Sequence, residues 1–178
     1  MEADLKLEVV RFDQVSPDFL ADIHTFCNQA FEEDLEPFLS TLQDATHVLG
    51  YLGNTLVSHA LWVTRWLQAG PNPVMRTAYI EAVATEKEYR NRGFASVVMK
   101  RVAEEIQDFE LGALSPFSVG YYEQLGWERW QGPLFIRKDD GLIRTPEDED
   151  VMILRLPRTP DLDLTAPLSA EWREGELW

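Results

Sequence analysis

A glycine-containing turn at residues 90–95 is the part of the sequence best suited to chemistry. Arg90, Gly93 and Ala95 follow a β-rich segment, and a helical apolar pattern begins directly after them. A helix that opens on such a turn presents free backbone N–H groups and the positive end of its dipole, which together bind anions. Arg92 adds a second positive charge that suits phosphate. The pattern predicts a site for a phosphate-bearing cofactor.

Two common phosphate motifs do not describe this turn. A Walker loop would continue with Gly-Lys-Ser or Gly-Lys-Thr, and a dinucleotide fingerprint needs three glycines, whereas the turn contains Gly93 alone. A surface turn that happens to contain arginines is the alternative interpretation.

Glu81 lies upstream of the turn in the middle of a predicted strand, where glutamate is disfavoured. One interpretation is a charge at a strand edge, because carboxylates away from functional sites are usually solvated or paired. The other is a general base, since a carboxylate can accept the proton that a nucleophile loses, directly or through water.

Length and composition are typical of one globular domain. The chain has 178 residues, of which 45% are hydrophobic and 26% are charged. No segment approaches the roughly 20 apolar residues that span a bilayer, and the acidic start of the chain does not resemble a signal peptide. Cys27 is the only cysteine, so no internal disulfide can form. We expect a cytoplasmic protein that does not bind membranes.

The net charge of −15 argues against nucleic-acid binding, which needs basic patches. It favours a cationic partner by long-range attraction, although acidic charge that serves only solubility is an equally good interpretation. The acidic residues gather at residues 32–34, at residues 147–150 and in the last eight residues.

The order of predicted elements indicates a mixed α/β sheet domain. Strands are expected at residues 5–12, 47–52, 55–63, 74–85, 109–114, 127–130 and 151–156, with a hairpin turn at Gly53 and Asn54. Helices are expected to start at Ser16, at Phe94 and at Val119, with a short helix broken near Pro37. Residues 131–150 are expected to form an acidic, turn-rich loop, and the tail from Pro157 is expected to lack a regular element.

The turn at residues 90–95 resembles the acyl-coenzyme-A pyrophosphate loop of the GCN5-related N-acetyltransferases. Within that superfamily the sequence is most similar to the aminoglycoside 2′-N-acetyltransferases. The resemblance runs almost continuously from about residue 78 to the C-terminus and is thin before it. The segments that carry it are residues 30–34, 41–42, 79–84, 111–115, 122–127, 130–133, 144–146 and 171–178.

The resemblance implies a central, mostly antiparallel sheet flanked by helices, in one domain over residues 1–178 whose tail, residues 157–178, folds back into the active site. It implies acetyl-CoA as cofactor and acetylation of the 2′-amino group of an aminoglycoside antibiotic, which confers resistance. The acetyl group would pass directly to the amine in a ternary complex, without an acyl-enzyme. No metal is implied, and a homodimer is compatible with the family.

Roles for individual residues follow from the resemblance. Glu81 would be the general base, the backbone of Val83 would donate to the thioester carbonyl, and Tyr122 would protonate the leaving thiolate, although the adjacent Tyr121 leaves that assignment ambiguous from sequence alone. Residues expected to bind the cofactor are Ala82, Val83, Ala84, Arg90, Asn91, Arg92, Gly93, Phe94, Ala95 and Ser96. Residues expected to bind the cationic aminosugar are Asp34, Glu81, Ser115, Glu176 and Trp178.

The remaining polar residues receive structural interpretations. We expect Trp178 to anchor the C-terminus by burial, and Glu171 and Glu174 to lie in a solvated part of the tail. His24 and His47 are expected on a helix and at a strand edge. His59 is expected to be a partly buried histidine with satisfied hydrogen bonds.

Two segments depart from the family pattern. Residues 116–120 are short and apolar where the family is usually polar, and Phe38 lies near the place of a second aspartate. Both changes suggest a narrower and less acidic pocket, which favours a small, atypical aminoglycoside such as kasugamycin. The alternatives are an acetyltransferase for another amine (a polyamine, a metabolite or a peptide) and a non-catalytic protein that binds acetyl-CoA or the drug.

Overall fold

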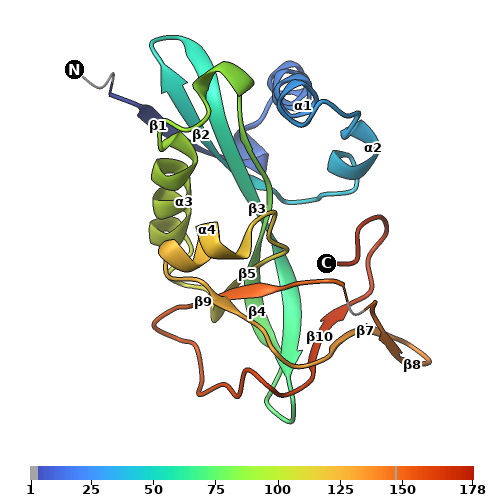
Figure 1. Cartoon of the computed structure of the whole chain (residues 1–178). Coiled ribbons are helices and arrows are strands. Elements are labelled where there is room, and N and C mark those ends of the chain that lie inside the picture. Colours follow the sequence, from blue (N-terminus) through green and yellow to red (C-terminus); the bar gives the residue numbers. More distant parts are fainter. Residues whose placement is uncertain (1–3, 147) are drawn as a thin grey trace. The chain divides into compact units, whose positions relative to one another are not determined.

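The computed structural model describes residues 4–146 and 148–178, so Glu147 of the predicted acidic cluster lies outside the described residues. Figure 1 shows its helices and strands. Contacts group the chain into two compact units. Unit 1 comprises Met1–Val63 and Glu81–Glu105, and unit 2 comprises Thr64–Ile80 and Ile106–Trp178. The strands β3 (Thr55–Ala69) and β4 (Met75–Thr85) run from one unit into the other. The single domain expected over residues 1–178 stays a prediction.

Unit 1 contains an antiparallel arrangement in which β2 pairs with β1 and β3. Gly53 takes the left-handed conformation (φ 58°) that a tight hairpin turn requires, so the predicted hairpin is confirmed. His47 therefore lies in a central strand and not at the expected strand edge. Besides β3 and β4, the elements of this unit are β1 (Lys6–Arg11), η1 (Phe12–Gln14), α1 (Pro17–Phe31), α2 (Glu36–Leu39), β2 (Thr46–Leu52), η2 (Lys87–Tyr89) and α3 (Phe94–Glu105).

Helices α1 and α3 cover opposite faces of these strands. A Cβ on Gly50 of β2 would lie 3.3 Å from the side chain of Val98 in α3. On the other face, the ring of His59 in β3 packs at the edge of Phe26 in α1, with centroids 6.4 Å apart. This alternation follows from the register, because His59 pairs with Leu49, the residue next to Gly50.

Both N-terminal helices begin with the local signals that their sequences contain. The side chain of Ser16 accepts a hydrogen bond from the backbone N–H of Phe19 (3.2 Å) and caps α1, as predicted. Pro37 lies in the first turn of α2, where its missing N–H costs nothing. The expectation that Pro37 breaks this helix is therefore wrong.

Unit 2 is a sheet with the strand order β6-β9-β5-β4-β3-β10-β7-β8. Strand β5 runs parallel to β4, and β10 runs parallel to β7. The pairs β3–β10, β5–β9, β6–β9 and β7–β8 are antiparallel, so the predicted mixed and mostly antiparallel sheet is confirmed. The elements wholly in this unit are β5 (Leu111–Leu114), α4 (Val119–Gln124), β6 (Glu128–Arg129), β7 (Leu134–Lys138), β8 (Gly141–Arg144), β9 (Met152–Arg155) and β10 (Leu168–Glu171).

Three strands of unit 2 occupy segments for which the sequence predicted no regular structure. Strands β7 and β8 lie in the expected loop, and β10 lies in the expected irregular tail. All four residues of β8 are exposed, and β10 has only four residues, so neither has the alternating pattern that identifies a strand. Their pairing partners define them instead.

The backbone at Gly132 makes an unusually close approach to the segment that precedes β10. A Cβ at this position would lie 1.9 Å from the carbonyl oxygen of Ala166 and 2.6 Å from that of Thr165. The N–H of Gly132 also donates to the carbonyl of Leu164 (2.9 Å). Only glycine permits this contact. Among the described residues, no helix is long and apolar enough to cross a membrane.

Candidate active site

Three consecutive residues of β4, Glu81, Ala82 and Val83, are partly exposed in a strand that is otherwise largely buried. Ala82 has a φ of 50°, a left-handed conformation that costs a residue other than glycine about 1–3 kcal/mol. Irregularities of this kind re-aim side chains and peptide groups out of the regular ladder. Glu81 and Val83, which were predicted as general base and oxyanion donor, flank the irregularity.

A buried histidine fixes one side of this irregularity. The carbonyl of Ala82 lies 2.8 Å from Nδ1 of His59, which is completely buried. Two residues further along the strand, the carbonyl of Ala84 accepts from the hydroxyl of Ser58 (3.1 Å). Neighbouring side chains of β3 thus bind backbone carbonyls of β4 on both sides of Val83.

The predicted pyrophosphate turn has the backbone geometry of an anion cradle. Asn91 and Gly93 both have positive φ angles, 62° and 79°, and α3 begins immediately afterwards at Phe94. A Cβ on Gly93 would meet no atom within 4 Å, so the space beside the turn is open. A turn that opens a helix of 12 residues next to open space fits the pyrophosphate of coenzyme A.

The two arginines of this turn make different contacts. The guanidinium of Arg90 donates to the carbonyl of Thr85 (3.1 Å) and to that of Ala30. Arg90 therefore joins the turn to β4 and α1 through its side chain. The guanidinium of Arg92 lies over the ring of Tyr89, 5.2 Å from the centroid. Of the two arginines, Arg92 is thus the better candidate for a phosphate contact through its side chain.

Asp34 lies exposed in unit 1, two residues before the start of α2. Its carboxylate accepts a hydrogen bond from the backbone N–H of Glu36 (3.1 Å). Such a contact stabilises the start of a short helix and leaves the second carboxylate oxygen available. Its predicted role in substrate binding stays a prediction.

Tyr122 is buried in an aromatic cluster of unit 2. Its ring makes edge contacts with Phe117, Tyr121 and Trp127, at centroid distances of 5.2, 5.0 and 6.2 Å. Burial, and secondarily Tyr121, raises the pKa of Tyr122 well above its usual range. The phenol therefore keeps its proton at physiological pH, as a general acid must. Ser115 is exposed just after β5.

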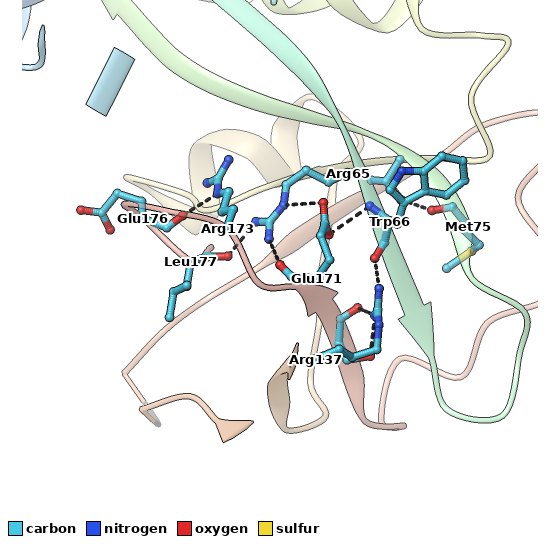
Figure 2. A network of polar contacts seen from close by, with 10 residues as sticks. Arg65, Trp66, Met75, Arg137, Glu171, Arg173, Glu176 and Leu177 are labelled. Carbon is cyan, nitrogen blue, oxygen red and sulfur yellow. Dashed lines mark hydrogen bonds and ion pairs between the residues drawn. The ribbon is translucent and has the colours of Figure 1, made fainter. Parts of the chain in front are cut away.

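The C-terminal tail is held by arginines of unit 2 (Figure 2). Arg65 of β3 is 1% exposed, and its guanidinium donates to the carbonyls of Glu171 and Leu177, at 2.7 Å each. Nε of Arg65 also lies 3.5 Å from the Glu171 carboxylate, which accepts from the backbone N–H of Trp66. Arg173 donates to the carbonyl of Glu176. The expectation that Glu171 is simply solvated is therefore wrong, whereas Glu174 is exposed.

The end of the chain is buried, as predicted. Trp178 is 6% exposed, and its indole Nε1 has no hydrogen-bond partner among the described residues. The guanidiniums of Arg65 and Arg173 both lie over the ring of Tyr79, at 4.9 and 5.3 Å from its centroid. A buried N–H without an acceptor costs about 1–3 kcal/mol, so a ligand that supplies an acceptor would be favoured there.

Acidic groups far apart in the sequence approach one another in unit 2. The pKa of Glu149 is raised by partial burial and then by the negative charges of Asp148, Glu176 and Asp150. The tail residue Glu176 thus shares an electrostatic environment with the acidic segment after β8. Such a group of carboxylates attracts cationic ligands.

The structure divides the predicted site residues between the two units. Glu81, Ala82, Val83, the pyrophosphate turn and Asp34 belong to unit 1, and Ser115, Tyr122, Glu176 and Trp178 belong to unit 2. Their predicted roles stay predictions. The sequence analysis did not identify Arg65, although an arginine among the apolar residues of a strand is an available signal. It also assigned His59 no contact with the β4 backbone.

Comparison with known proteins identifies the fold and a related activity. Residues 11–130 match the family described as acetyltransferase (GNAT) domain. The chain is 35% identical over 162 residues to an aminoglycoside 2′-N-acetyltransferase from Mycolicibacterium fortuitum, which covers 84% of this chain and 80% of that protein.

Solved structures share the fold at low sequence identity. The GNAT family N-acetyltransferase YhbS from Escherichia coli, determined in complex with CoA, aligns over 95% of this chain and 92% of its own, with a TM-score of 0.61 and 12% identity. Escherichia coli ElaA aligns over 84% and 99%, with a TM-score of 0.59 and 14% identity. A probable N-acyltransferase from Enterococcus faecalis has a TM-score of 0.59 and 22% identity, and this chain spans 33% of its length.

Proposed function

We propose that this chain, which belongs to the GNAT acetyltransferase family and uses acetyl-CoA, acetylates the 2′-amino group of an aminoglycoside. The product would be an antibiotic with one positive charge fewer. The relative from Mycolicibacterium fortuitum supports this substrate class. It is an aminoglycoside 2′-N-acetyltransferase, and its alignment covers 84% of this chain.

The main structural support for a polycationic substrate is the way in which the C-terminal tail is bound by Arg65. Arg65 holds the carbonyls of Glu171 and Leu177, and this contact positions Glu176 and Trp178 in a defined conformation. Glu176 lies in the electrostatic environment of Asp148, Glu149 and Asp150. A polycationic sugar needs several carboxylates at fixed positions, and an ordered acidic tail supplies them.

The chemistry assigns one task to each of three residues. The acetyl group comes from the thioester of acetyl-CoA. The carboxylate of Glu81 accepts the proton that the attacking amine loses, directly or through water. The backbone N–H of Val83 donates to the thioester oxygen as negative charge develops there. The phenol of Tyr122 gives its proton to the sulfur as the carbon–sulfur bond breaks.

The buried cysteine supports direct transfer to the amine. Burial raises the pKa of the Cys27 thiol to about 12, so the thiolate that would form an acyl-enzyme is absent at neutral pH. A reduced thiol of this kind is also compatible with the cytoplasm as the place of the reaction.

We infer a small aminoglycoside such as kasugamycin from the apolar residues at two predicted contact segments. Phe117, within residues 116–120, is 69% exposed although it is a large aromatic side chain. Phe38 of α2 lies near the predicted place of an aspartate. Apolar side chains at these positions disfavour a substrate with many ammonium groups and favour one with fewer.

The test is release of the CoA thiol from acetyl-CoA with kanamycin, gentamicin, kasugamycin, spermidine and a peptide N-terminus as acceptors. NMR of the product identifies the acetylated nitrogen. Turnover with an aminoglycoside at its 2′-amino group supports the proposal, and turnover with kasugamycin alone supports the narrower form. Turnover only with spermidine or the peptide contradicts the substrate class. Tight binding of acetyl-CoA without thiol release would indicate a non-catalytic protein.

A further inference from the structure

We propose that His59 is a positioning residue for acyl transfer, which fixes the direction and the donor strength of the Ala82–Val83 peptide. His47 in turn fixes the tautomer of His59. This inference rests on the proposed function of the Val83 N–H as oxyanion donor. It concerns two histidines that make no predicted contact with either substrate.

The hydrogen bonds define the tautomers. Nδ1 of His59 lies 2.8 Å from the carbonyl oxygen of Ala82, and a carbonyl can only accept, so Nδ1 of His59 bears the proton. In a neutral ring the other nitrogen, Nε2, is then an acceptor. Nε2 of His59 lies 2.9 Å from Nδ1 of His47, which must therefore donate. The two rings form a directed chain from His47 to Ala82.

Burial keeps both rings neutral. His59 is completely buried and His47 is 3% exposed. Burial lowers the pKa of His59 to about 3 and that of His47 to about 4, with smaller contributions from His24 to both values and from His47 to that of His59. The other groups at this face are the thiol of Cys27, 3.7 Å from Nδ1 of His59, and the pair of His24 and Glu36 (2.6 Å).

The second ring nitrogen of His47, Nε2, is an acceptor in this tautomer and needs a donor. His47 lines a cavity of about 270 Å³ together with His24 and Glu36. Most of its lining is apolar, but Ser40, His24 and Glu36 provide polar partners for a water molecule that would donate to Nε2 of His47. The hydrogen bonds run from His47 at the cavity through His59 to the β4 backbone.

The orientation of the reacting N–H follows from peptide geometry. All peptide bonds in the described residues are trans, so the carbonyl of Ala82 and the N–H of Val83 point in opposite directions. Because His59 binds the carbonyl on the buried side, the N–H of Val83 points away from the histidines. The left-handed φ of Ala82 costs energy, and the contact with His59 stabilises that conformation.

The same contact strengthens the donor. A peptide whose carbonyl accepts a hydrogen bond becomes more polarised, so its N–H donates more strongly. Losing an oxyanion donor altogether costs about 10²–10³ in kcat, and displacing a reacting group by about 1 Å can cost 10²-fold. A displaced Val83 N–H should therefore lower kcat by about 10–100-fold.

Two substitutions of His59 separate positioning from packing. His59→Phe keeps a ring of similar size in the core but removes the donor to Ala82. His59→Asn loses the ring, yet its amide nitrogen lies at about the place of Nδ1 and can donate to the same carbonyl. If His59 only fills space, His59→Phe should have the higher kcat of the two variants. If His59 positions the peptide, His59→Asn should have the higher kcat.

The readouts include one that does not depend on turnover. The infrared stretch of the carbonyl in [1-¹³C]acetyl-CoA, bound without an amine, reports polarisation of the thioester by the Val83 N–H. We expect a shift to lower frequency in the wild type, a smaller shift in His59→Phe and recovery in His59→Asn. The dissociation constant of CoA, which lacks this carbonyl, should stay within about twofold in both variants, since less than 0.5 kcal/mol is at stake.

A carbonyl shift and kcat in His59→Phe equal to the wild type, in a protein that still binds CoA, would overturn the proposal. Nitrogen-15 NMR of the wild-type histidines tests it without a variant, since it must find the proton on Nδ1 of both His47 and His59. A wild type that acetylates none of the amines contradicts the proposed function alone, because the infrared shift still measures the effect of His59.

Discussion

The guanidinium of Arg65 and the carbonyl of Leu177 lie 2.7 Å apart although 112 positions of the chain separate the two residues. The same guanidinium binds the carbonyl of Glu171, so the buried Arg65 side chain joins both ends of the segment from residue 171 to residue 177. The arginine stem is fully buried in β3, which makes the contact rigid. The conformation of the tail therefore depends on a side chain from the first half of the sequence.

We expect Arg65→Met to release the tail. Methionine preserves apolar packing but leaves two part-buried carbonyls without their donor, at about 1–3 kcal/mol for each unsatisfied group, and it removes the ion pair with the Glu171 carboxylate. KM for the amine should rise by about 10–100-fold, with each tenfold step equal to 1.4 kcal/mol, while KM for acetyl-CoA changes little. Hydrogen exchange of residues 171–178 should accelerate. Arg11→Met, at an exposed arginine of β1, is the matched control and should change neither quantity.

We expect Glu81→Gln and Tyr122→Phe each to lower kcat by about 10²–10⁴-fold. Both changes preserve shape and remove only the proton-transfer group, so the melting temperature should stay near that of the wild type. Steady-state kinetics on the best acceptor amine provides the measurement. Turnover equal to the wild type in both variants would contradict the proposed mechanism. Tyr121→Phe is the control for the tyrosine assignment.

Stability should fall in weak acid because of His47 and His59. Their pKa values in the folded protein, about 4 and about 3, are below the unfolded value of 6.5, so the unfolded chain binds more protons between these limits. The contribution of both groups is fully present above pH 6.5 and is lost as pH falls towards their folded pKa values. Each histidine adds up to about 1.4 kcal/mol per pH unit to the slope.

Urea unfolding of the wild type at a series of pH values measures this slope. The double variant His47→Asn/His59→Asn supplies the reference, because the carboxylates that also respond to acid are unchanged in it. A wild-type slope between pH 6.5 and 4 that equals the slope of the double variant would show that the two rings do not titrate as described.

Cys27 should not react in the native protein. Its thiol is completely buried, and burial raises its pKa to about 12, so a disulfide reagent should modify it only after unfolding. Cys27→Ala should retain kcat within about threefold, since the proposed mechanism contains no acyl-enzyme. Mass spectrometry of protein incubated with acetyl-CoA alone provides a second check, because an acetylated Cys27 would contradict direct transfer.

Phe117 should contribute to substrate selectivity. Its side chain is 69% exposed and its ring packs against that of Tyr122, so replacing it with serine removes apolar surface beside the proposed acid. We expect Phe117→Ser to raise kcat/KM for gentamicin relative to kasugamycin by about 3–10-fold, equivalent to roughly 1 kcal/mol. An unchanged ratio would exclude this residue from the substrate contact. Phe109, which is buried, is unsuitable as a control; Phe12, exposed in η1, is suitable.

Much of the fold could be predicted because strong local signals determine it. The serine cap of α1, the hairpin at Gly53 and the glycine turn before α3 each depend on neighbouring residues alone. Strands β8 and β10 could not be predicted, since four exposed residues or four residues after a proline have no distinctive period. Tertiary pairing determines such strands, and a single sequence does not contain that information in a readable form.

The candidate site divides in the same way. Glu81 and the residues of the turn were identified because their type is unusual for their position. The roles of Arg65 and His59 were not, because a buried polar side chain is recognised only by its partners, and those partners are backbone carbonyls that any sequence provides. The left-handed φ of Ala82 is equally invisible, since alanine does not favour it.

Gly132 has a consequence for experiments that select variants with acetyltransferase activity from a random library. Every side chain at this position would collide with the backbone at Ala166, two residues before β10, and would push β10 away from its neighbours. Survivors should therefore all retain glycine there, as uniformly as they retain any residue that takes part in the reaction. An invariant Gly132 in such a library would reflect the close backbone contact with Ala166 and not a role in the reaction. Measuring the amount of folded protein in the Gly132 variants would distinguish these two causes.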